Sequence, residues 1–273
     1  MRDPIENTLL VLPGVALLAI GFLVPIAQML VLSVSGETGP TLAHFVRFLS
    51  DPFYLGVLWR TVKLSAIITL LCTLIGFPYA YIAARVGPRA RLWLILLVIL
   101  PLMTSVVVRT FGWLVLLGRN GLLTEALRAL GFGGRSFQLM HTETAIVLGM
   151  TQVLLPFMAL SILGVILRID RRLEEAARTM GCGFVGTVRT VVLPLAMPGV
   201  VAGSLLVFTL SASSFVTPTL LGGVRLQVLA GSIYRSITQT LDWPFAAAQA
   251  VILFVGVFVI LIQYARLARG HDG

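Results

Sequence analysis

Charged residues are scarce in this 273-residue chain: they make up 11% of it, against 58% hydrophobic residues. Soluble domains average about 25% charged and about 45–50% apolar residues, so this composition excludes an ordinary soluble domain. Cysteine is almost absent too, with Cys72 in an apolar run and Cys182 in a basic loop. Two isolated cysteines supply neither a disulfide framework nor a zinc site, and we expect both to serve packing.

Motifs of catalysis are also missing. The sequence contains no G-x-x-x-x-G-K-[ST] phosphate-binding loop, and the glycine-rich run 131–134 continues into Arg135 and predicts a loop turn. His44, His141 and His271 are scattered, without the spacing of metal ligands. We therefore predict a chain that is not an enzyme, with no catalytic residues, no metal and no cofactor of its own.

Long runs of apolar residues are the main feature of the sequence. A membrane-spanning helix needs about 20 largely apolar residues, because backbone polar groups in lipid must be satisfied within the segment. Six runs meet this requirement: about Thr8–Ser35, about Leu64–Ala84, from after Arg91 to about Leu117, between Glu143 and Arg168, about Pro198–Leu220, and between Asp242 and Arg266. The first is longer than the ~7–15-residue core of a cleaved signal peptide, so we expect it to be retained. The sequence predicts an all-α integral membrane protein with six transmembrane helices.

The formal net charge of +9 would suggest a nucleic-acid partner in a soluble protein. Here the arginines flank the apolar runs, so we attribute the charge to membrane topology and expect no nucleic acid. Loops on the side of both termini carry more Lys and Arg than the opposite loops, which places both termini in the cytoplasm. The opposite segments are too short to fold independently. We predict one membrane domain over 1–273, with a first helix and outer segment over 1–60, five core helices over 61–267 and a cytoplasmic loop over 168–198.

The loop between the fourth and fifth runs is predicted to contain a short helix. Leu173, Ala177, Met180 and Phe184 recur at spacings of 4, 3 and 4, which is one apolar stripe of a helix. Gly181 interrupts the pattern, as expected where a helix ends. Such a helix either inserts an apolar ridge into a partner protein's groove or rests on lipid headgroups.

Oppositely charged residues four positions apart support the same helix. Arg171 precedes Glu175, and Glu174 precedes Arg178. Each pair contributes only about 0.2–0.5 kcal/mol, so the pairs favour a helix without explaining its apolar stripe.

A twenty-residue pattern in this loop carries a family resemblance. Glu175-Ala176-Ala177, then Gly181, then Val191 and Leu193-Pro194, resembles the Glu-Ala-Ala signature of permease subunits of ABC-type importers, with Val191 where the family usually has Ile. The resemblance implies the type I ABC importer permease fold, with a coupling helix that docks on a cytoplasmic ATPase. Glu175, Ala176, Ala177, Gly181, Leu193 and Pro194 are the implied coupling residues. In this scheme the small residues allow the helix backbone to approach the ATPase closely, and Glu175 offers a negative charge to the edge of the ATPase cleft. Leu193-Pro194 set how the chain re-enters the membrane.

The same resemblance implies the partners. We expect two cytoplasmic ATPase subunits, which bind the ATP and Mg²⁺ that this chain does not, a second similar permease, and an external solute-binding protein. The assembly would lie in the lipid of a bacterial inner membrane.

Three stretches, 101–105, 108–113 and 214–223, are similar to permeases of the spermidine/putrescine type. Polyamines are therefore the expected solute, although permeases for aminophosphonates, opines or amino-acid-like solutes share much of these stretches. The predicted spans contain no Asp or Glu to meet a polycation. Aromatic rings could bind a polycation in place of carboxylates, through cation–π contacts worth roughly 0.5–2 kcal/mol each. Acidic groups could also come from the second permease or the binding protein.

Arg109 is the one charge well inside a predicted span, where burial costs at least about 2.5 kcal/mol. It either serves a solute site, or reaches outer headgroups or a neighbouring subunit. The candidate pathway residues are Arg109, Phe111, Trp113, Phe215 and Thr217. Prolines 101, 156 and 218 could kink their spans.

Two other classes of membrane protein are alternatives to the importer permease. An ion-driven secondary transporter would predict inverted repeats and intramembrane acids, and neither is apparent. A structural subunit without a pathway would leave the signature in the loop unexplained.

Overall fold

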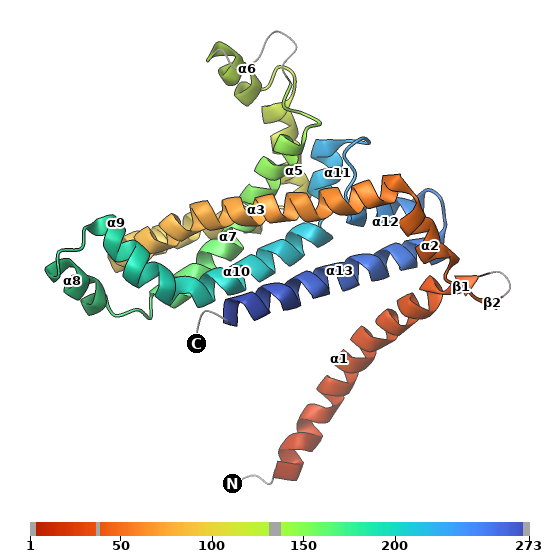
Figure 1. Cartoon of the computed structure of the whole chain (residues 1–273), viewed down its shortest axis with the longest axis horizontal. Helices are drawn as coiled ribbons and strands as arrows, with labels where there is room; N and C mark the ends of the chain where they lie inside the picture. The colour runs from red at the N-terminus through yellow and green to blue at the C-terminus, as the bar shows by residue number, and fades with distance from the viewer. Residues whose placement is uncertain (1–3, 37–38, 131–137, 270–273) are drawn as a thin grey trace. The chain divides into compact units, whose positions relative to one another are not determined.

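The computed structural model describes residues 4–36, 39–130 and 138–269 (Figure 1). Two compact units make up the chain: Met1–Leu55 with Ser232–Gly256, and Gly56–Gly231 with Val257–Gly273. The boundary after Leu55 lies near the predicted boundary at residue 60, but residues 232–256 also belong to the first unit.

Helices form almost all of the described chain, together with one antiparallel pair of two-residue strands, β1 (Ser35–Gly36) and β2 (Gly39–Pro40). The helices are α1 (Pro4–Ser33), α2 (Ala43–Ser50), α3 (Pro52–Arg85), α4 (Pro88–Ile99), η1 (Leu100–Met103), α5 (Val106–Leu117), α6 (Leu122–Ala129), α7 (Glu143–Ile166), α8 (Arg171–Thr179), α9 (Phe184–Thr187), η2 (Val188–Val192), α10 (Leu193–Ser213), α11 (Val216–Gly222), α12 (Leu229–Thr238) and α13 (Trp243–Arg269).

Six segments of the described chain are long and apolar enough to cross a membrane: Pro13–Ser33, Pro52–Arg85, Val106–Ala129, Glu143–Ile166, Phe184–Ser213 and Trp243–Gln263. Their number confirms the predicted six spans. The fourth and sixth also agree closely with the predicted limits. The second begins twelve residues before the predicted Leu64, because the helix continues past the cations Arg60 and Lys63, which precede the apolar run.

The third and fifth spans differ from the prediction. The expected helix from Arg91 to Leu117 is divided into α4 and α5, with extended backbone at Thr104 and Ser105 between them. The expected fifth helix to Leu220 stops at Ser213, and α11 follows as a separate turn. A proline lies within four residues of each break, since Pro101 precedes the first and Pro218 follows the second, and each lacks the amide that a continuous helix would use. The third span that does qualify, Val106–Ala129, combines α5 and α6 in succession.

The core of the second unit lies where α7 and α10 pack side by side, with α3 alongside α7 (Figure 1). Two glycines one turn apart on α10 permit the approach. A β-carbon at Gly199 would lie 2.9 Å from Val165 Cγ2 and 3.0 Å from the Ser161 carbonyl oxygen, and one at Gly203 would lie 2.7 Å from Met158 Sδ. Small residues allow transmembrane helices such close contact, which compensates for the lack of a hydrophobic driving force between helices in lipid.

Aromatic contacts form the core of the first unit. Phe48 of α2 is fully buried, and the Tyr54 ring packs against Phe48 and, edge to face, against Phe245 of α13. Arg47 of α2 places its guanidinium 4.1 Å from the centre of the Phe245 ring and donates to Asp242 at 2.8 Å. These contacts fix α2 against the start of α13, so Asp242 already has a cationic partner within the chain.

Candidate functional site: the α8 helix and the α5–α7–α11 cluster

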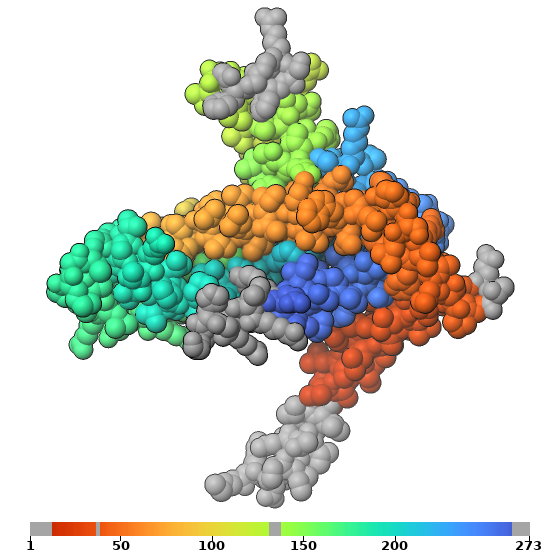
Figure 2. Space-filling view, in the orientation of Figure 1, coloured from red at the N-terminus to blue at the C-terminus, as the bar shows by residue number. Residues whose placement is uncertain are grey.

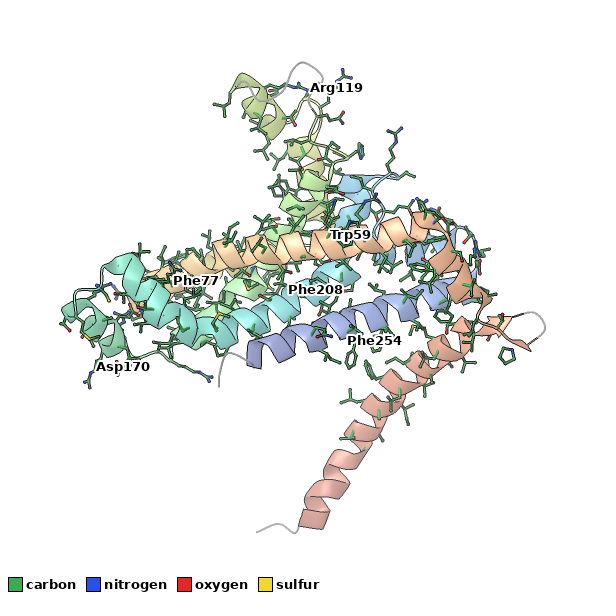
Figure 3. The ribbon with its side chains drawn as sticks, in the orientation of Figure 1. Trp59, Phe77, Arg119, Asp170, Phe208 and Phe254 are labelled. Atoms are coloured by element: carbon green, nitrogen blue, oxygen red, sulfur yellow. The ribbon has the colours of Figure 1, made fainter. Side chains whose placement is uncertain are left out.

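The predicted loop helix is present as α8, and its two ends follow from local sequence. Asp170 at its start (Figure 3) accepts a hydrogen bond from the Arg172 amide at 3.0 Å, which caps the helix. At the other end Gly181 has φ +87°, a left-handed conformation that glycine adopts without steric cost. The Gly181 and Cys182 amides turn back to the Arg178 and Ala177 carbonyls, so the last carbonyls of α8 are satisfied. This hydrogen-bonded turn ends the helix where the sequence predicted.

The predicted apolar stripe of α8 does not lie on one face. Leu173, Met180 and Phe184 are exposed, at 47%, 78% and 59%, whereas Ala177 is 3% exposed. The prediction of a single stripe was wrong, because α8 also packs within the chain and needs a small residue there. The exposed residues still form an apolar surface, which we call the α8–α9 face: Leu173, Ala176, Met180, Phe184 and Val185. Figure 2 shows α8 and α9 forming the molecular surface at one end of α3.

Among the coupling residues implied by the signature, Glu175, Ala176 and Gly181 are exposed and Ala177 is buried. The small side chain at position 177 therefore contributes to packing within the chain itself. Contact of the exposed residues with an ATPase stays a prediction at this point.

The charge pairs predicted along α8 are replaced by contacts to α3. Glu174, expected to pair with Arg178, accepts hydrogen bonds from the Tyr81 hydroxyl at 2.9 Å and from Arg85 Nη2. Arg171, expected to pair with Glu175, donates instead to the carbonyls of Ala84 at 3.2 Å and Arg85 at 3.0 Å. The prediction considered neighbours on one helix only, and the end of a helix 86 residues earlier offers better partners.

Sequence reasoning thus missed Tyr81 and Arg85. One signal was available, because Arg85 closes an apolar run at the same membrane side as the loop, and Tyr81 lies one turn before it on the same face.

Leu193 and Pro194 lie at the start of α10, and both are exposed. They lie where helical backbone continues from α9 through η2 into α10, and their role in setting how the chain re-enters the membrane stays a prediction. The five residues of η2 form a π-helical turn. A π turn inserts one extra residue into the helix, a rare arrangement that accommodates a missing amide without breaking the helix.

The predicted pathway residues fall into two groups. Trp113 and Thr217 lie together beside Gly149 of α7, where a β-carbon would be 3.2 Å from Thr217 Cγ2 and 3.8 Å from Trp113 Cδ1. The Trp113 indole donates to Gln152 Oε1 at 2.9 Å, and the hydroxyls of Thr110 and Thr217 lie 3.1 Å apart. This cluster joins α5, α7 and α11 through polar contacts inside an apolar region.

Arg109 and Phe111 point elsewhere. Arg109 Nη2 donates to the Thr104 carbonyl at 2.9 Å, in the extended segment before α5. Its Nε and Nη1 are buried and have no hydrogen-bond partner among the described residues. Phe111 is 55% exposed, and Phe215 is half-buried in the break between α10 and α11. The structure therefore does not bring the five predicted residues into one site.

Glu143, the acid at the start of the predicted fourth span, is engaged within the chain. Lys63 Nζ lies 2.6 Å from Glu143 Oε2, and Arg60 Nε lies 3.8 Å from Oε1. The carboxylate sits in the first turn of α7, where the helix dipole also favours negative charge. Glu143 is therefore already neutralised by two cations.

A pocket of about 380 Å³ lies between α3, α10 and the end of α13. It is lined by Ala66, Thr69, Leu70, Thr73, Val200, Ser204, Leu205, Phe208, Ile260 and Leu261. The Thr69 and Thr73 hydroxyls donate to carbonyls of their own helix, and none of the lining side chains is charged. Among the described residues, no group of three or more His, Cys, Asp or Glu side chains could hold a metal ion.

Comparison with known proteins decides the family. Residues 76–271 match the family of the binding-protein-dependent transport system inner membrane component. The chain belongs to this family. The permease is 34% identical over 254 residues to the spermidine/putrescine transport system permease protein PotB of Haemophilus influenzae, covering 90% of this chain and 88% of that protein.

Two further relatives show the spread of named solutes. PotB of Escherichia coli is 33% identical over 229 residues, with 84% of this chain and 83% of that protein covered. The molybdenum transport system permease protein ModB of Mycobacterium bovis is also 33% identical, over 232 residues, with 84% and 86% covered.

Solved structures agree on the fold. A bacterial ABC transporter involved in the import of the acidic polysaccharide alginate superposes with a TM-score of 0.78 over 98% of this chain and 96% of that chain, at 17% identity. A chain of the MetNI methionine ABC transporter superposes with a TM-score of 0.58 over 81% and 98%, at 20% identity. These findings confirm the resemblance and the fold class predicted from the sequence. The chain is a multi-pass inner membrane permease subunit of a binding-protein-dependent transport system.

Proposed function

We propose that this permease forms half of a translocation pathway for polyamines, and that α8 couples it to ATP hydrolysis by two separate cytoplasmic subunits. A second, similar permease would complete the pathway, and an external binding protein would deliver the solute. The observation that carries the coupling role is the exposed α8–α9 face on a short helix held at the end of α3.

The composition of that face supports a protein partner. Leu173, Met180 and Phe184 expose apolar surface on a segment between two membrane-crossing helices, and contiguous exposed apolar surface marks an interaction site. Glu175 and Ala176 lie exposed on the same helix, so a groove could approach the backbone closely and meet one carboxylate at its rim.

Topology follows from the same assignment. An ATPase partner is cytoplasmic, so α8 would lie on the cytoplasmic side, and the even number of spans would place both termini there too. The excess of Lys and Arg in the loops on this side supports that orientation.

The polyamine assignment rests on similarity to the two PotB proteins over more than four-fifths of the chain. The permease itself offers little to hold a polycation: Glu143 and Asp242 are paired with cations. We therefore assign solute selection to the binding protein and to the second permease, with this chain lining the path by aromatic and hydroxyl groups such as Trp113 and Thr217.

A small anion is the second candidate solute. Arg109 has two buried nitrogens without a partner among the described residues, and ModB is similar to this chain over 232 residues. A guanidinium with free donors suits an oxyanion better than a polycation.

Import into lipid vesicles separates the two solutes. The complex of both permeases and the ATPase is reconstituted with ATP inside and the binding protein outside, and uptake of radiolabelled spermidine is measured. We expect ATP-dependent uptake that excess putrescine suppresses and excess molybdate does not. Uptake of molybdate in place of spermidine would refute the polyamine assignment.

Substitution of Glu175 tests the coupling role. Glu175→Ala should reduce co-purification of the ATPase with the permease, while Glu125→Ala, at another exposed glutamate on α6, should not. Equal recovery of ATPase with both variants would count against docking on α8.

A further inference from the structure

Glu174 faces into the chain, unlike its neighbour Glu175, and both of its carboxylate oxygens are used. The Tyr81 hydroxyl donates to Oε2 at 2.9 Å, and Arg85 Nη2 donates to Oε1. The side chains of Arg85 and Glu174 are only 16% and 7% exposed. A buried carboxylate with two donors from another helix is a specific attachment, since removing one partner would leave an uncompensated buried charge.

A second contact joins the same two helices. Arg171, three residues before Glu174 and so on the same face of α8, donates to the Ala84 and Arg85 carbonyls. These are terminal carbonyls of α3, which have no partner within their own helix, and a cation there also complements the helix dipole. The α8 helix is therefore fixed to α3 by its carboxylate and by its guanidinium.

The chain connections of α8 to its neighbours in sequence are turns. Residues 167–170 link it to α7 and residues 180–183 link it to α9, and neither link is helical. A displacement of α8 passed through these turns alone would be partly absorbed by them. The contacts to α3 offer a direct route into a membrane-crossing helix.

At its other end, α3 is tied to α7. Lys63 binds Glu143 in the first turn of α7, and Arg60 lies close to the same carboxylate. Lys63 and Arg85 are 22 residues apart, which is about 33 Å of helix and close to the ~30 Å thickness of the hydrocarbon core. The ion pairs thus mark the two ends of the membrane-crossing part of α3.

We infer that Glu174 is a positioning residue for transport: through Arg85 and Tyr81 it fixes the coupling helix to α3, so that α8 and α3 move as one body. The inference rests on the proposed coupling role of α8 and adds the element that receives the motion. Docking on the ATPase uses the exposed face of α8, and Glu174 on the opposite side transmits the displacement to the spans.

The test measures solute imported per ATP hydrolysed, in vesicles that contain the full complex and use spermidine as the probe. Glu174→Gln keeps the size of the side chain and can still accept from Tyr81, but it removes the charge that Arg85 faces. We expect the variant complex to assemble in normal amount and to hydrolyse ATP within about twofold of the parent, with solute per ATP reduced about tenfold. The exchanged pair Arg85→Glu with Glu174→Arg should restore the ratio to within about threefold of the parent.

Controls separate attachment from general loss of charge. Glu125→Gln and Arg89→Gln change exposed residues of the same types and should leave the ratio unchanged. An unchanged ratio in Glu174→Gln would overturn the inference. So would a parallel loss of complex, hydrolysis and import that the exchanged pair fails to restore, because that is the result of a purely structural role.

The parent complex tests the proposed function independently. If the parent complex takes up no spermidine, the polyamine assignment fails. The coupling is then measured by a different ratio, the rate of ATP hydrolysis with the binding protein divided by the rate without it. Under the inference, Glu174→Gln hydrolyses ATP without the binding protein nearly as fast as with it, so this ratio falls about tenfold at equal docking, and an unchanged ratio overturns the inference.

Discussion

Alanine at position 199 tests how closely α7 and α10 approach each other. The added β-carbon would lie 2.9 Å from Val165 Cγ2, 3.0 Å from the Ser161 carbonyl oxygen and 3.1 Å from Ile162 Cα. Two of these atoms belong to backbone, which cannot rotate away, so the helices must separate by several tenths of an ångström. Overpacking of this kind costs about 1–3 kcal/mol.

The control for this variant is Gly164→Ala on α7, where an added β-carbon meets no atom within 4 Å. Both substitutions replace glycine inside a helix, a change that favours the helix by about 1 kcal/mol, so this contribution cancels in the comparison. The free energies of unfolding of the two variants should differ by the overpacking cost, about 1–3 kcal/mol.

Thermal unfolding of the purified permease in detergent measures the difference. At roughly 2–4 °C per kcal/mol for a large domain, Tm of Gly199→Ala should lie about 2–12 °C below that of Gly164→Ala. Equal Tm values would show that α7 and α10 are not in close contact at this position, and the packing argument for the second unit would fail.

Three smaller predictions follow from other contacts. Gly181→Ala should lower the free energy of unfolding by about 1–2 kcal/mol, because alanine is strained at φ +87°. The control Gly183→Ala should not lower it, since Gly183 has a negative φ and an added β-carbon there meets no atom within 4 Å. Thermal unfolding of the two variants measures the difference. Thr217→Val should cost about 1 kcal/mol by removing the hydroxyl beside Thr110, and a double-mutant cycle with Thr110→Val should recover part of this cost if the two hydroxyls bond each other. Lys63→Gln should cost only about 0.2–1 kcal/mol, since the pair is one-third exposed, and its effect on Tm should shrink in high salt.

Periodicity and composition were sufficient to predict the number of spans and the place of α8. A run of about 20 apolar residues has few alternatives to a membrane helix, because lipid offers no partner to free backbone groups. The helix α8 was visible from its spacing pattern and from Gly181, whose left-handed φ is a local requirement of the turn.

The breaks within spans could not be predicted with the same success. Pro156 lies inside the continuous helix α7, whereas Pro101 and Pro218 accompany a division of the helix. The residue type is the same in all three cases. The difference depends on the neighbouring helices that satisfy or leave open the freed carbonyls, which the local sequence does not contain.

The orientation of α8 could not be predicted from the sequence for a related reason. Glu174 and Glu175 are chemically identical and adjacent, and local pairing energies of a few tenths of a kcal/mol gave both a partner on α8. The fold assigns Glu174 to Arg85 and Tyr81, 89 and 93 residues away in sequence, and leaves Glu175 exposed. Only the three-dimensional arrangement separates an anchoring carboxylate from one on the outer surface.

The π-helical turn η2 fixes the rotational phase between the cytoplasmic helices and α10. Each residue of an α-helix advances the direction of its side chain by about 100°, but a π turn closes its hydrogen bond over one more residue and so absorbs that residue within the turn. Deleting one residue within Val188–Val192 should therefore restore an ordinary α-helical turn and leave α9 on nearly the same side of α10. In this permease a change of length by one residue is tolerated at the π turn, whereas the same change in a regular part of α10 would turn the α8–α9 face by about 100°.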